Sequence, residues 1–335
     1  MTKVAINGFG RIGRLLFRRL LSSESIKVVA VNDLVGIKTL TYLLRYDSAQ
    51  GKLKNQFKID EKNNTLVFDG GRTLFFSEKQ PELLPWKDLR IDIVVESTGL
   101  FLTSELCEKH LSAGAKKVIM SAPSKSQGVK TIVFGINHNT LSSGDKIISC
   151  ASCTTNCLAP VVNVLEKEFG IVCGFMNTIH AYTADQRLQD APHKDLRRGR
   201  AGAYSLVPTG TGAAKAIGLV IPSVAGKLDG IAVRAPVLTG SVCDITVTLK
   251  QSPSVSEINE RMKSYANESF AYCEDPIVSA DIVGDEHGSV FDSLLTQLVE
   301  SGDQRMYKLF SWYDNESSYV AQLLRTLEYF SKIRN

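Results

Sequence analysis

Three cysteines and several hydroxyl-bearing residues are grouped within nine positions, residues 149–157 (SCASCTTNC). The group follows an apolar β-type stretch at 146–148 and precedes a predicted amphipathic helix over 158–169. A cysteine at such a junction faces the positive end of the helix, which lowers the pKa of its thiol and favours the nucleophilic thiolate. The pattern indicates an enzyme that forms a thiohemiacetal or a thioester.

Cys153 is the candidate nucleophile. Its neighbours are poor core residues but suit an anion at a helix N-terminus: Ser152, Thr154, Thr155 and Asn156. His180 ends a predicted strand and could lie beside the cysteine as its base. The alternative, a small buried thiol, is the usual fate of a free cysteine, so the pairing with His180 stays a hypothesis at this level.

The cysteines as a set favour free thiols. There are seven, an odd number, and no secretion signal precedes them, which argues against a disulfide framework and for a reducing compartment. A metal site built from Cys150, Cys153, Cys157 and His180 is disfavoured, because the spacing lacks a second paired arm of ligands. We therefore expect no metal.

A glycine pattern at residues 8–13 (GFGRIG) lies directly after a predicted strand and directly before a predicted helix. Gly8 permits a sharp turn, Gly10 lets a pyrophosphate approach the backbone, and Gly13 allows close packing of helix on strand. Asp33 follows the next strand, where a carboxylate can accept hydrogen bonds from ribose hydroxyls and repel a ribose phosphate. The spacing favours NAD over NADP, against the alternative of a structural turn and a surface aspartate.

The first half of the chain alternates strands and helices. We predict strands at 3–7, 27–32, 91–96, 117–120, 131–134 and 146–149, helices at 11–21, 37–45 and 103–113, and a hairpin-like region at 57–76. Continuous β-branched runs such as 28–31 are typical of a parallel sheet covered on both faces. The sequence predicts an α/β fold with a Rossmann-type parallel sheet domain.

The second half has longer strands and few helices. Strands are predicted at 174–181, 228–237, 241–249 and 306–312, a long functional loop at 183–205, and a final helix at 318–333. This pattern favours an α+β catalytic domain with a mostly antiparallel sheet. We expect a cofactor domain over 1–151, completed by a C-terminal helix at 318–335, and a catalytic domain over 152–317.

Composition sets broad bounds. The 335 residues are 44% hydrophobic and 22% charged, enough for two packed cores. The net charge of +4 is spread along the chain, and its one dense basic run, 197–200, is short, so no nucleic-acid partner is required. With neither a charged leader nor an apolar stretch of bilayer length, we expect a cytoplasmic protein without membrane contacts.

Five motifs carry a close resemblance to a known family. They are residues 7–14 (NGFGRIGR), 96–99 (ESTG), 151–157 (ASCTTNC), 211–215 (TGAAK) and 312–316 (WYDNE). In their order and spacing the chain resembles the phosphorylating glyceraldehyde-3-phosphate dehydrogenases from Lys3 to the C-terminal helix. The resemblance implies an NAD-dependent oxidoreductase of glycolysis and gluconeogenesis that converts D-glyceraldehyde 3-phosphate and inorganic phosphate to 1,3-bisphosphoglycerate.

The resemblance also implies roles for single residues. Cys153 attacks the aldehyde, and His180 stabilises the thiolate and accepts the thiohemiacetal proton before phosphate releases the thioester. The substrate phosphate would contact Thr183, Asp185 and Arg234, and inorganic phosphate would contact Ser152, Thr154, Thr211 and Gly212. The cofactor would contact Gly8, Gly10, Arg11, Ile12, Gly13, Asp33, Lys79, Ser121, Asn315 and Tyr319. A homotetramer follows as well, because the family packs the 183–205 loop across a subunit interface.

Some positions depart from the family pattern. Cys150 replaces a common Asn, and we hypothesise that its thiol speeds oxidative inactivation by resolving a sulfenic acid on the nucleophile. Ala191 resembles NADP-tolerant members, whereas Leu34 after Asp33 favours NAD, so dual cofactor use stays open. Two rival interpretations are an erythrose-4-phosphate dehydrogenase, disfavoured by Thr211 and Arg234, and a non-catalytic NAD- or RNA-binding protein, disfavoured by the retained Cys153 and His180.

Overall fold

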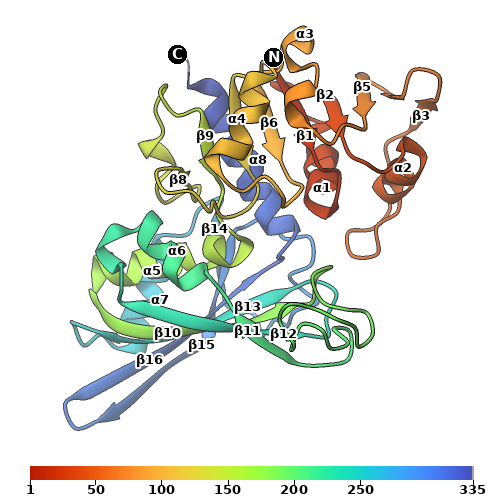
Figure 1. Ribbon diagram of the computed structural model, residues 1–335. Coiled ribbons are helices and arrows are strands. Elements are labelled where there is room, and N and C mark those ends of the chain that lie inside the picture. Colours follow the sequence, from red (N-terminus) through yellow and green to blue (C-terminus); the bar gives the residue numbers. More distant parts are fainter. Residues whose placement is uncertain (334–335) are drawn as a thin grey trace. The chain divides into compact units, whose positions relative to one another are not determined.

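The computed structural model describes residues 1–333, which fall into two compact units (Figure 1). The first unit comprises residues 1–132 and 138–151 together with the C-terminal stretch from Leu323 onward. The second comprises residues 133–137 and 152–322. Each unit has its own sheet and its own buried core.

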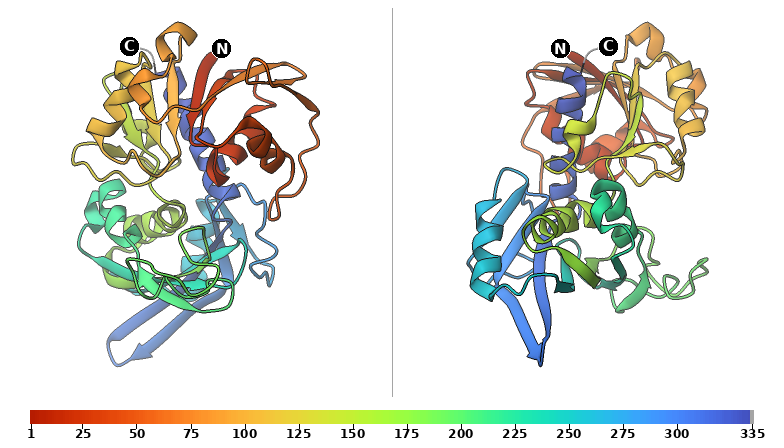
Figure 2. Two further views of the ribbon diagram at one scale, coloured as in Figure 1. Left: turned by 45° about the vertical axis from the view of Figure 1, so that its right-hand side comes forward. Right: turned by 90° about the vertical axis from the view of Figure 1, so that its left-hand side faces the viewer.

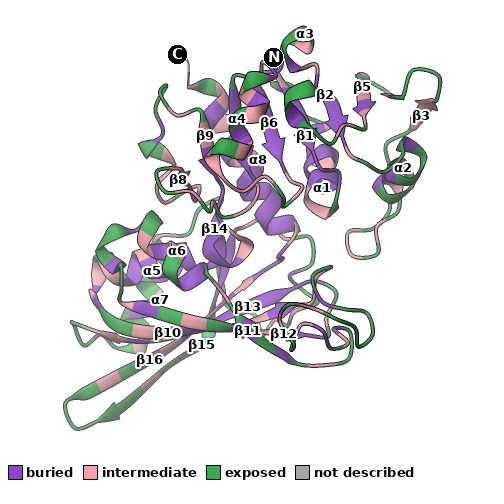
Figure 3. Ribbon diagram, viewed as in Figure 1, coloured by how far each residue is buried: buried purple, intermediate pink, exposed green. Residues whose placement is uncertain are grey.

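The sheet of the first unit has nine strands in the order β3-β4-β5-β2-β1-β6-β7-β9-β8. Seven run parallel: β1 (Thr2–Asn7), β2 (Ile26–Asn32), β5 (Gly71–Phe76), β6 (Ile93–Glu96), β7 (Lys117–Met120), β8 (Lys130–Thr131) and β9 (Ile147–Ser149). The hairpin β3 (Phe57–Asp60) and β4 (Thr65–Phe68) extends one edge antiparallel. Figure 3 shows the central strands buried, as continuous apolar runs predict, and the Rossmann-type sheet is confirmed.

Helices pack on this sheet and cover its apolar residues. They are α1 (Arg11–Leu20), α2 (Ile37–Arg45), α3 (Trp86–Leu89), α4 (Ser104–Ser112) and the C-terminal part of α8 (Ser317–Lys332), with short 3-10 turns η1 (Pro81–Leu83) and η2 (His138–Thr140). Helix α4 begins where the Thr103 hydroxyl accepts a hydrogen bond from the Leu106 N–H at 3.3 Å. Trp86, fully buried, is the largest side chain of the core between α4 and the sheet.

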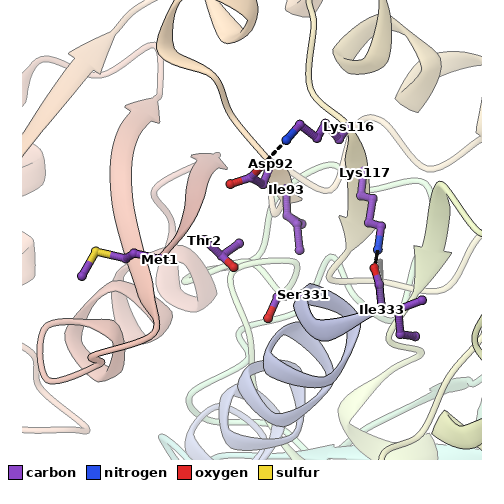
Figure 4. Close-up of a pocket in the computed structure, with 8 residues that line it drawn as sticks. All are labelled: Met1, Thr2, Asp92, Ile93, Lys116, Lys117, Ser331 and Ile333. Carbon is purple, nitrogen blue, oxygen red and sulfur yellow. Dashed lines mark hydrogen bonds and ion pairs between the residues drawn. The ribbon is translucent and has the colours of Figure 1, made fainter. Parts of the chain in front are cut away.

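The end of α8 is held by a lysine of β7. The Nζ of Lys117 donates to the carbonyl oxygens of Ile333 at 2.7 Å and Phe330 at 3.0 Å, and it lies over the Phe330 ring. Burial lowers the pKa of this ammonium, so the helix-end carbonyls replace its lost hydration. Beside it, Lys116 pairs with Asp92 across a cavity of about 490 Å³ at the amino ends of the strands (Figure 4). None of the predicted site residues lines that cavity.

The second unit is built on a seven-stranded sheet in the order β11-β12-β10-β13-β16-β15-β14. Its strands are β10 (Ile171–Ala181), β11 (Val207–Gly210), β12 (Leu228–Ala235), β13 (Ser241–Leu249), β14 (Phe270–Cys273), β15 (Ser289–Ser301) and β16 (Gln304–Tyr313). Only β10/β12 and β14/β15 pair parallel, which confirms the mostly antiparallel sheet. Figure 2 shows the hairpin of β15 and β16 extending beyond the rest of this unit.

Three helices belong to this sheet: α5 (Cys153–Glu168), α6 (Ala213–Val220) and α7 (Val255–Ser264), with a 3-10 turn η3 (Pro222–Val224) after α6. Helix α5 contacts β10, β13, β15 and β16, and eleven of its 16 residues are buried. Elsewhere on the sheet apolar side chains stay exposed, among them Phe175, Ile231 and Met306.

Some predicted elements were wrong. Helix α5 begins at Cys153, five residues before the predicted start, because Ser152 caps it and the polar residues 154–156 form its first turn. The predicted strand 131–134 is reduced to β8, since a turn begins just after it. Helices α6 and α7 were not predicted. Residues 183–205 form a long loop, as expected, with an isolated bridge between Arg187 and Ala201.

Candidate active site

The glycine-rich turn of the first unit follows β1. Gly8 has φ +91° and its N–H donates to the Asn32 carbonyl at 2.8 Å, so the turn is tied to the end of β2. A Cβ on Gly8 would lie 2.6 Å from the Thr98 nitrogen, and one on Gly13 would lie 2.2 Å from the Gly8 oxygen. Only glycine therefore fits at these two positions, and α1 starts close against the strand ends.

A cavity of about 500 Å³ opens at the carboxyl ends of the parallel strands. Its walls come from the loops after β1, β2, β5 and β6: Asn7, Gly8, Gly10, Asn32, Asp33, Leu34, Glu78, Lys79, Ser97, Thr98, Leu100 and Phe101. Asp33 accepts from the backbone N–H of Phe9 at 2.7 Å and of Val35 at 2.9 Å, which orients its carboxylate. The cavity is thus a preformed cleft with a carboxylate in its wall.

Of the predicted cofactor residues, the structure brings Gly8, Gly10, Asp33 and Lys79 together in this cavity. Arg11 and Ile12 open α1 directly after Gly10, and Gly13 packs on the turn. Ser121 follows β7, and its N–H donates to the Glu96 carbonyl at 2.9 Å. Asn315 and Tyr319 belong to the second unit.

Asn315 is buried with its amide orientation determined by three donors. Its Oδ1 accepts from Ser241 Oγ at 3.0 Å, Gly240 N at 3.2 Å and Thr239 Oγ1 at 3.3 Å. Nδ2 is therefore the group that this side chain can present to a ligand. Tyr319 is buried in the first turn of α8.

In the second unit, Cys153 is the first residue of α5. Ser152 caps the helix by accepting from the Thr155 N–H at 3.1 Å, and the Cys153 Sγ lies 3.4 Å from the Nε2 of His180. His180 comes from β10, on which α5 packs. The predicted pairing of the cysteine with the histidine is thus present in the geometry.

The other ring nitrogen of His180 has two neighbours. Arg234 Nη1 lies 2.7 Å from Nδ1, and the Ala181 carbonyl oxygen lies 2.6 Å from it. A guanidinium only donates, so its contact favours a proton on Nε2, whereas the carbonyl favours a proton on Nδ1 and a bare Nε2. Arg234 also donates to that carbonyl at 3.3 Å. The two contacts thus favour opposite tautomers of the neutral ring, and the tautomer with a bare Nε2 is the one that can accept a proton from Cys153.

The protonation of the pair is set by burial. Burial, followed by the Arg234 charge, lowers the pKa of His180 to about 3, so the imidazole is neutral near pH 7. Burial raises the pKa of the Cys153 thiol above its ordinary value, against the Arg234 charge and hydrogen bonds with Thr154. The sequence predicted a lowered pKa for the Cys153 thiol at the helix N-terminus. That prediction is wrong, because desolvation of the thiol outweighs the nearby positive charge.

Of the remaining predicted anion-contact residues, Arg234 lies against His180, and Thr183, Thr211 and Gly212 stand on other segments of the second unit. The Nε of Arg234 is buried without a hydrogen-bond partner among the described residues, so the guanidinium retains a donor for a ligand. Thr211 and Gly212 lie at the start of α6, where the Thr211 hydroxyl accepts from the Ala213 N–H at 3.2 Å. The Thr183 N–H donates to Gln186 Oε1 at 2.7 Å.

Two predicted contacts are already committed to other groups. Thr154 is buried and its hydroxyl lies 2.9 Å from the hydroxyl of Tyr313, which bonds Thr178 on its other side. Asp185 forms an ion pair with Arg198 at 2.6 Å. Their side chains therefore stabilise the site more directly than they contact an anion.

Sequence reasoning missed several residues of this region. Tyr313 supports Thr154 and lies edge-on to the His180 ring, with centroids 5.9 Å apart. Arg198 bridges Asp185 and Thr209. Arg198 belongs to the basic run 197–200, which is visible in the sequence. The spacing of residues in a loop does not predict which acidic group such an arginine pairs with. Tyr313 lies within the 312–316 motif, but an aromatic residue at a strand end is ordinarily core, so no role was assigned to it.

Two negative observations concern the described residues 1–333. No group of three or more His, Cys, Asp and Glu side chains within them is placed to hold a metal ion. No helix in the same range combines the length and apolar character needed to cross a bilayer.

Comparison with known proteins gives a consistent match in both units. A family model described as glyceraldehyde 3-phosphate dehydrogenase, NAD binding domain, matches residues 2–104. A second, described as glyceraldehyde 3-phosphate dehydrogenase, C-terminal domain, matches residues 152–315. Together the two matches cover more than half of the chain and include Gly8, Asp33, Cys153 and His180.

Curated relatives match along the whole length. A glyceraldehyde-3-phosphate dehydrogenase of Mycoplasma pneumoniae is 60% identical over 331 residues, covering 99% of this chain and 98% of the relative. Proteins of the same name from Clostridium pasteurianum and Streptococcus pyogenes are 54% and 52% identical, with 99% of both chains covered in each case.

Proposed function

The chain belongs to the glyceraldehyde 3-phosphate dehydrogenase family, and we propose that the pair of Cys153 and His180 performs its chemistry. The protein is an NAD-dependent dehydrogenase that oxidises glyceraldehyde 3-phosphate with phosphorylation, a reaction of glycolysis. The observation that supports the roles of the pair best is the 3.4 Å contact between Sγ and Nε2 at the start of α5.

The neutral state of the pair defines the first step. As the sulfur bonds to the aldehyde carbon, the Nε2 of His180 takes the thiol proton and delivers it to the carbonyl oxygen, which forms a thiohemiacetal on Cys153. His180 then removes the hydroxyl proton as a hydride leaves the same carbon, which yields the thioester. NAD supplies the hydride acceptor when bound. Inorganic phosphate attacks the thioester carbonyl, and the thiolate of Cys153 leaves and regains a proton from His180.

We assign the cavity of the first unit to the dinucleotide. Its glycines leave room where side chains would collide, and its volume of about 500 Å³ suits a ligand of this size. Arg11 and Ile12 would offer backbone N–H groups to the pyrophosphate, and Asp33 would accept from ribose hydroxyls. Lys79 would contact the adenine side, Ser121 and Tyr319 the nicotinamide side, and Asn315 the carboxamide through Nδ2.

Asp33 disfavours a 2′-phosphate, so we expect tighter binding of NAD than of NADP. Equal affinities for the two cofactors would contradict this role of Asp33.

Phosphate recognition would use the cationic and hydroxyl groups near Cys153. We assign the substrate phosphate to Thr183 and Arg234, with Asp185 orienting the loop through Arg198. Inorganic phosphate would contact Ser152, Thr211 and Gly212, with Thr154 contributing its backbone N–H. Arg234 suits this role because its buried Nε has an unused donor.

We also propose a homotetramer in the cytoplasm. Exposed apolar side chains on the 183–205 loop and just after it, Leu188, Leu196, Tyr204 and Leu206, and on the sheet, Phe175 and Ile231, support subunit contacts. All seven cysteines are free thiols, which supports a reducing compartment. Sedimentation of the purified protein tests the assembly.

The deciding experiment follows NADH formation from glyceraldehyde 3-phosphate with and without inorganic phosphate. Wild type should turn over only with phosphate present, and Cys153→Ser should lose activity by orders of magnitude, because a serine hydroxyl is a far weaker nucleophile beside a neutral histidine. Cys173→Ser, which alters an exposed thiol of the same unit, is the matched control and should retain full activity. Equal rates for wild type and Cys153→Ser would remove Cys153 from the mechanism.

A further inference from the structure

A buried carboxylate lies under the dinucleotide cavity. Glu96, at the end of β6, is 2% exposed and receives hydrogen bonds at both oxygens. Its donors are Thr98 N and Thr98 Oγ1 on Oε1, and Asn7 Nδ2 and His110 Nε2 on Oε2. Among the described residues no lysine or arginine pairs with it. Such a group is costly unless its hydrogen bonds are complete.

One end of the network is set by backbone groups. The Glu78 N–H donates to Asn32 Oδ1 at 2.9 Å, and Asn32 Nδ2 donates to the Glu78 carbonyl at 2.9 Å, which determines the orientation of the Asn32 amide. The same Nδ2 donates to Asn7 Oδ1 at 2.7 Å. Asn7 must therefore turn its own Nδ2 toward Glu96, which it reaches at 2.6 Å.

The other end is set by an indole. Trp86 Nε1 can only donate, and it donates to His110 Nδ1 at 3.1 Å, so Nδ1 carries no proton. The proton of the neutral ring is then on Nε2, which lies 3.2 Å from Glu96 Oε2. Both lines of hydrogen bonds arrive at Glu96 as donors, and only the ionised carboxylate can accept all of them.

We propose that ionised Glu96 is a positioning residue for the dinucleotide cavity. It acts through three residues of the cavity wall: Asn7, Asn32 and Thr98. Through them it fixes the positions of the loops after β1, β2, β5 and β6 relative to one another. The inference rests on the proposed assignment of this cavity to NAD. Glu96 does not itself line the cavity; it sets the hydrogen-bond direction of side chains that do.

The direction of the bonds makes an exchange test possible. Glu96→Gln leaves the shape unchanged but places an NH2 group against either the Asn7 amide or the Thr98 N–H, so a cavity loop must shift. Asn7→Asp alone places two carboxylates at the 2.6 Å contact. In the double variant the carboxylate moves to position 7, accepts from Asn32 and from the new amide at 96, and lies near His110 Nε2, 3.4 Å from the present Asn7 Nδ2. Complementarity is restored among positions 7, 32 and 96, but the new NH2 group lies where Glu96 Oε2 accepted from His110 Nε2 at 3.2 Å, so we expect partial recovery.

The experiment measures the dissociation constant of NAD calorimetrically, together with KM for NAD and kcat, for wild type, both single variants and the double variant. Glu96→Gln should weaken NAD binding about tenfold, or 1.4 kcal/mol, with kcat at saturating NAD within about threefold of wild type. The double variant should bind NAD at least about threefold more tightly than Glu96→Gln. Unchanged binding in Glu96→Gln, or a double variant no tighter than it, would overturn the proposal.

Two controls separate this role from general stability and from the site assignment. Thr73→Val removes a buried hydrogen bond of the same sheet, from Thr73 Oγ1 to the Val28 carbonyl, and should leave NAD binding unchanged. If Thr73→Val weakens NAD binding as much as Glu96→Gln does, the effect of Glu96 is one of general stability and not of positioning. If Asp33→Ala binds NAD as wild type does, the cavity assignment fails. If Asp33→Ala weakens binding and Glu96→Gln does not, only the positioning role fails.

A spectroscopic test applies to the wild-type protein itself. The 15N shifts of the five histidines distinguish protonated from unprotonated ring nitrogens, and loss of one signal set in His110→Gln assigns His110. The proposal requires a neutral ring with the proton on Nε2. A doubly protonated ring, or a proton on Nδ1, would overturn it even if the variants of Glu96 and Asn7 do not fold.

Discussion

His180 and Arg234 lie directly opposite each other in the parallel pair of β10 and β12, and their side chains meet with Nη1 2.7 Å from Nδ1. The register of two strands therefore places a permanent positive charge behind the ring that faces Cys153. That charge supports the burial of the ring in keeping the imidazole neutral and able to accept a proton.

Replacement of Arg234 by Gln should move the acid limb of the kcat/KM profile to higher pH. Without the guanidinium the pKa of His180, lowered to about 3, rises toward its ordinary value, so the ring is protonated, and inactive as a base, up to a higher pH. KM for glyceraldehyde 3-phosphate should increase by about 10²-fold if Arg234 also contacts the substrate phosphate. Steady-state rates from pH 2.5 to 9 measure both effects.

The matched variant is Arg234→Lys, which retains the charge and loses the paired donors. It should leave the acid limb near its wild-type position while KM still increases. An acid limb that does not move in Arg234→Gln would mean that burial alone keeps His180 neutral.

Tyr313→Phe should slow catalysis as well as destabilise the protein. The lost hydroxyl leaves the buried hydroxyls of Thr154 and Thr178 without their shared partner, at a cost of about 1–3 kcal/mol, and loosens the first turn of α5 that holds Cys153. Urea unfolding and kcat measure the two effects. Tyr307→Phe, which removes another fully buried tyrosine hydroxyl bonded to the Pro253 carbonyl, should destabilise similarly but retain kcat; equal kcat values in the two variants would contradict the support of Cys153 by Tyr313.

The Arg11–Asp47 ion pair should make the stability of the first unit depend on pH. Burial acts to raise the pKa of Asp47, but hydrogen bonds from Arg11 and from the N–H groups of Gln50 and Ala49 outweigh it and hold the pKa below 3.8. A lowered pKa in the folded state means that the stabilisation is complete above the unfolded pKa and is lost as pH falls through the folded pKa.

Asp47→Asn should therefore lower the free energy of unfolding at pH 7 by about 1–3 kcal/mol, and this difference should shrink as the pH falls below 4. Denaturant titrations between pH 2.5 and 7 provide the measurement. A difference that is constant across that range would show that the charge of Asp47 contributes nothing.

Thiol reactivity should follow burial. Cys150 is 2% exposed and burial raises its pKa to about 12, as it does for Cys107, so neither has an appreciable thiolate fraction. A thiol with so small a thiolate fraction is a poor resolving group, so we now predict that Cys150→Asn is inactivated by peroxide at the wild-type rate, in place of the faster inactivation expected from the sequence. Mass spectrometry after brief alkylation should find label on Cys173 and not on Cys150; faster labelling of Cys150 would contradict its burial.

The parts of the fold that the sequence predicts correctly are those with a strong local pattern. The ranges 37–45, 117–120 and 241–249 agree with α2, β7 and β13, because apolar periodicity and clear boundaries determine them. Helix α5 was placed too late because its first turn is polar, and those polar residues serve the site. Helices α6 and α7 lacked a pattern strong enough to separate them from loops.

The candidate site divides in the same way. Gly8, Asp33 and Cys153 lie next to the ends of strands that the sequence pattern predicts, so their placement at strand ends was predictable. The 2.7 Å contact between Arg234 and His180, and the line of hydrogen bonds from Trp86 to Glu96, join residues that are distant in the chain. Such contacts depend on strand order and register, which no single-sequence spacing specifies.

Phe175 is 71% exposed and Ile231 is 52% exposed on the sheet of the second unit. A separate subunit therefore exposes apolar surface to the solvent. Dilution shifts any assembly toward separate subunits by mass action. For the proposed homotetramer, very dilute samples should therefore lose activity as separated subunits adsorb to vessel walls through these apolar side chains.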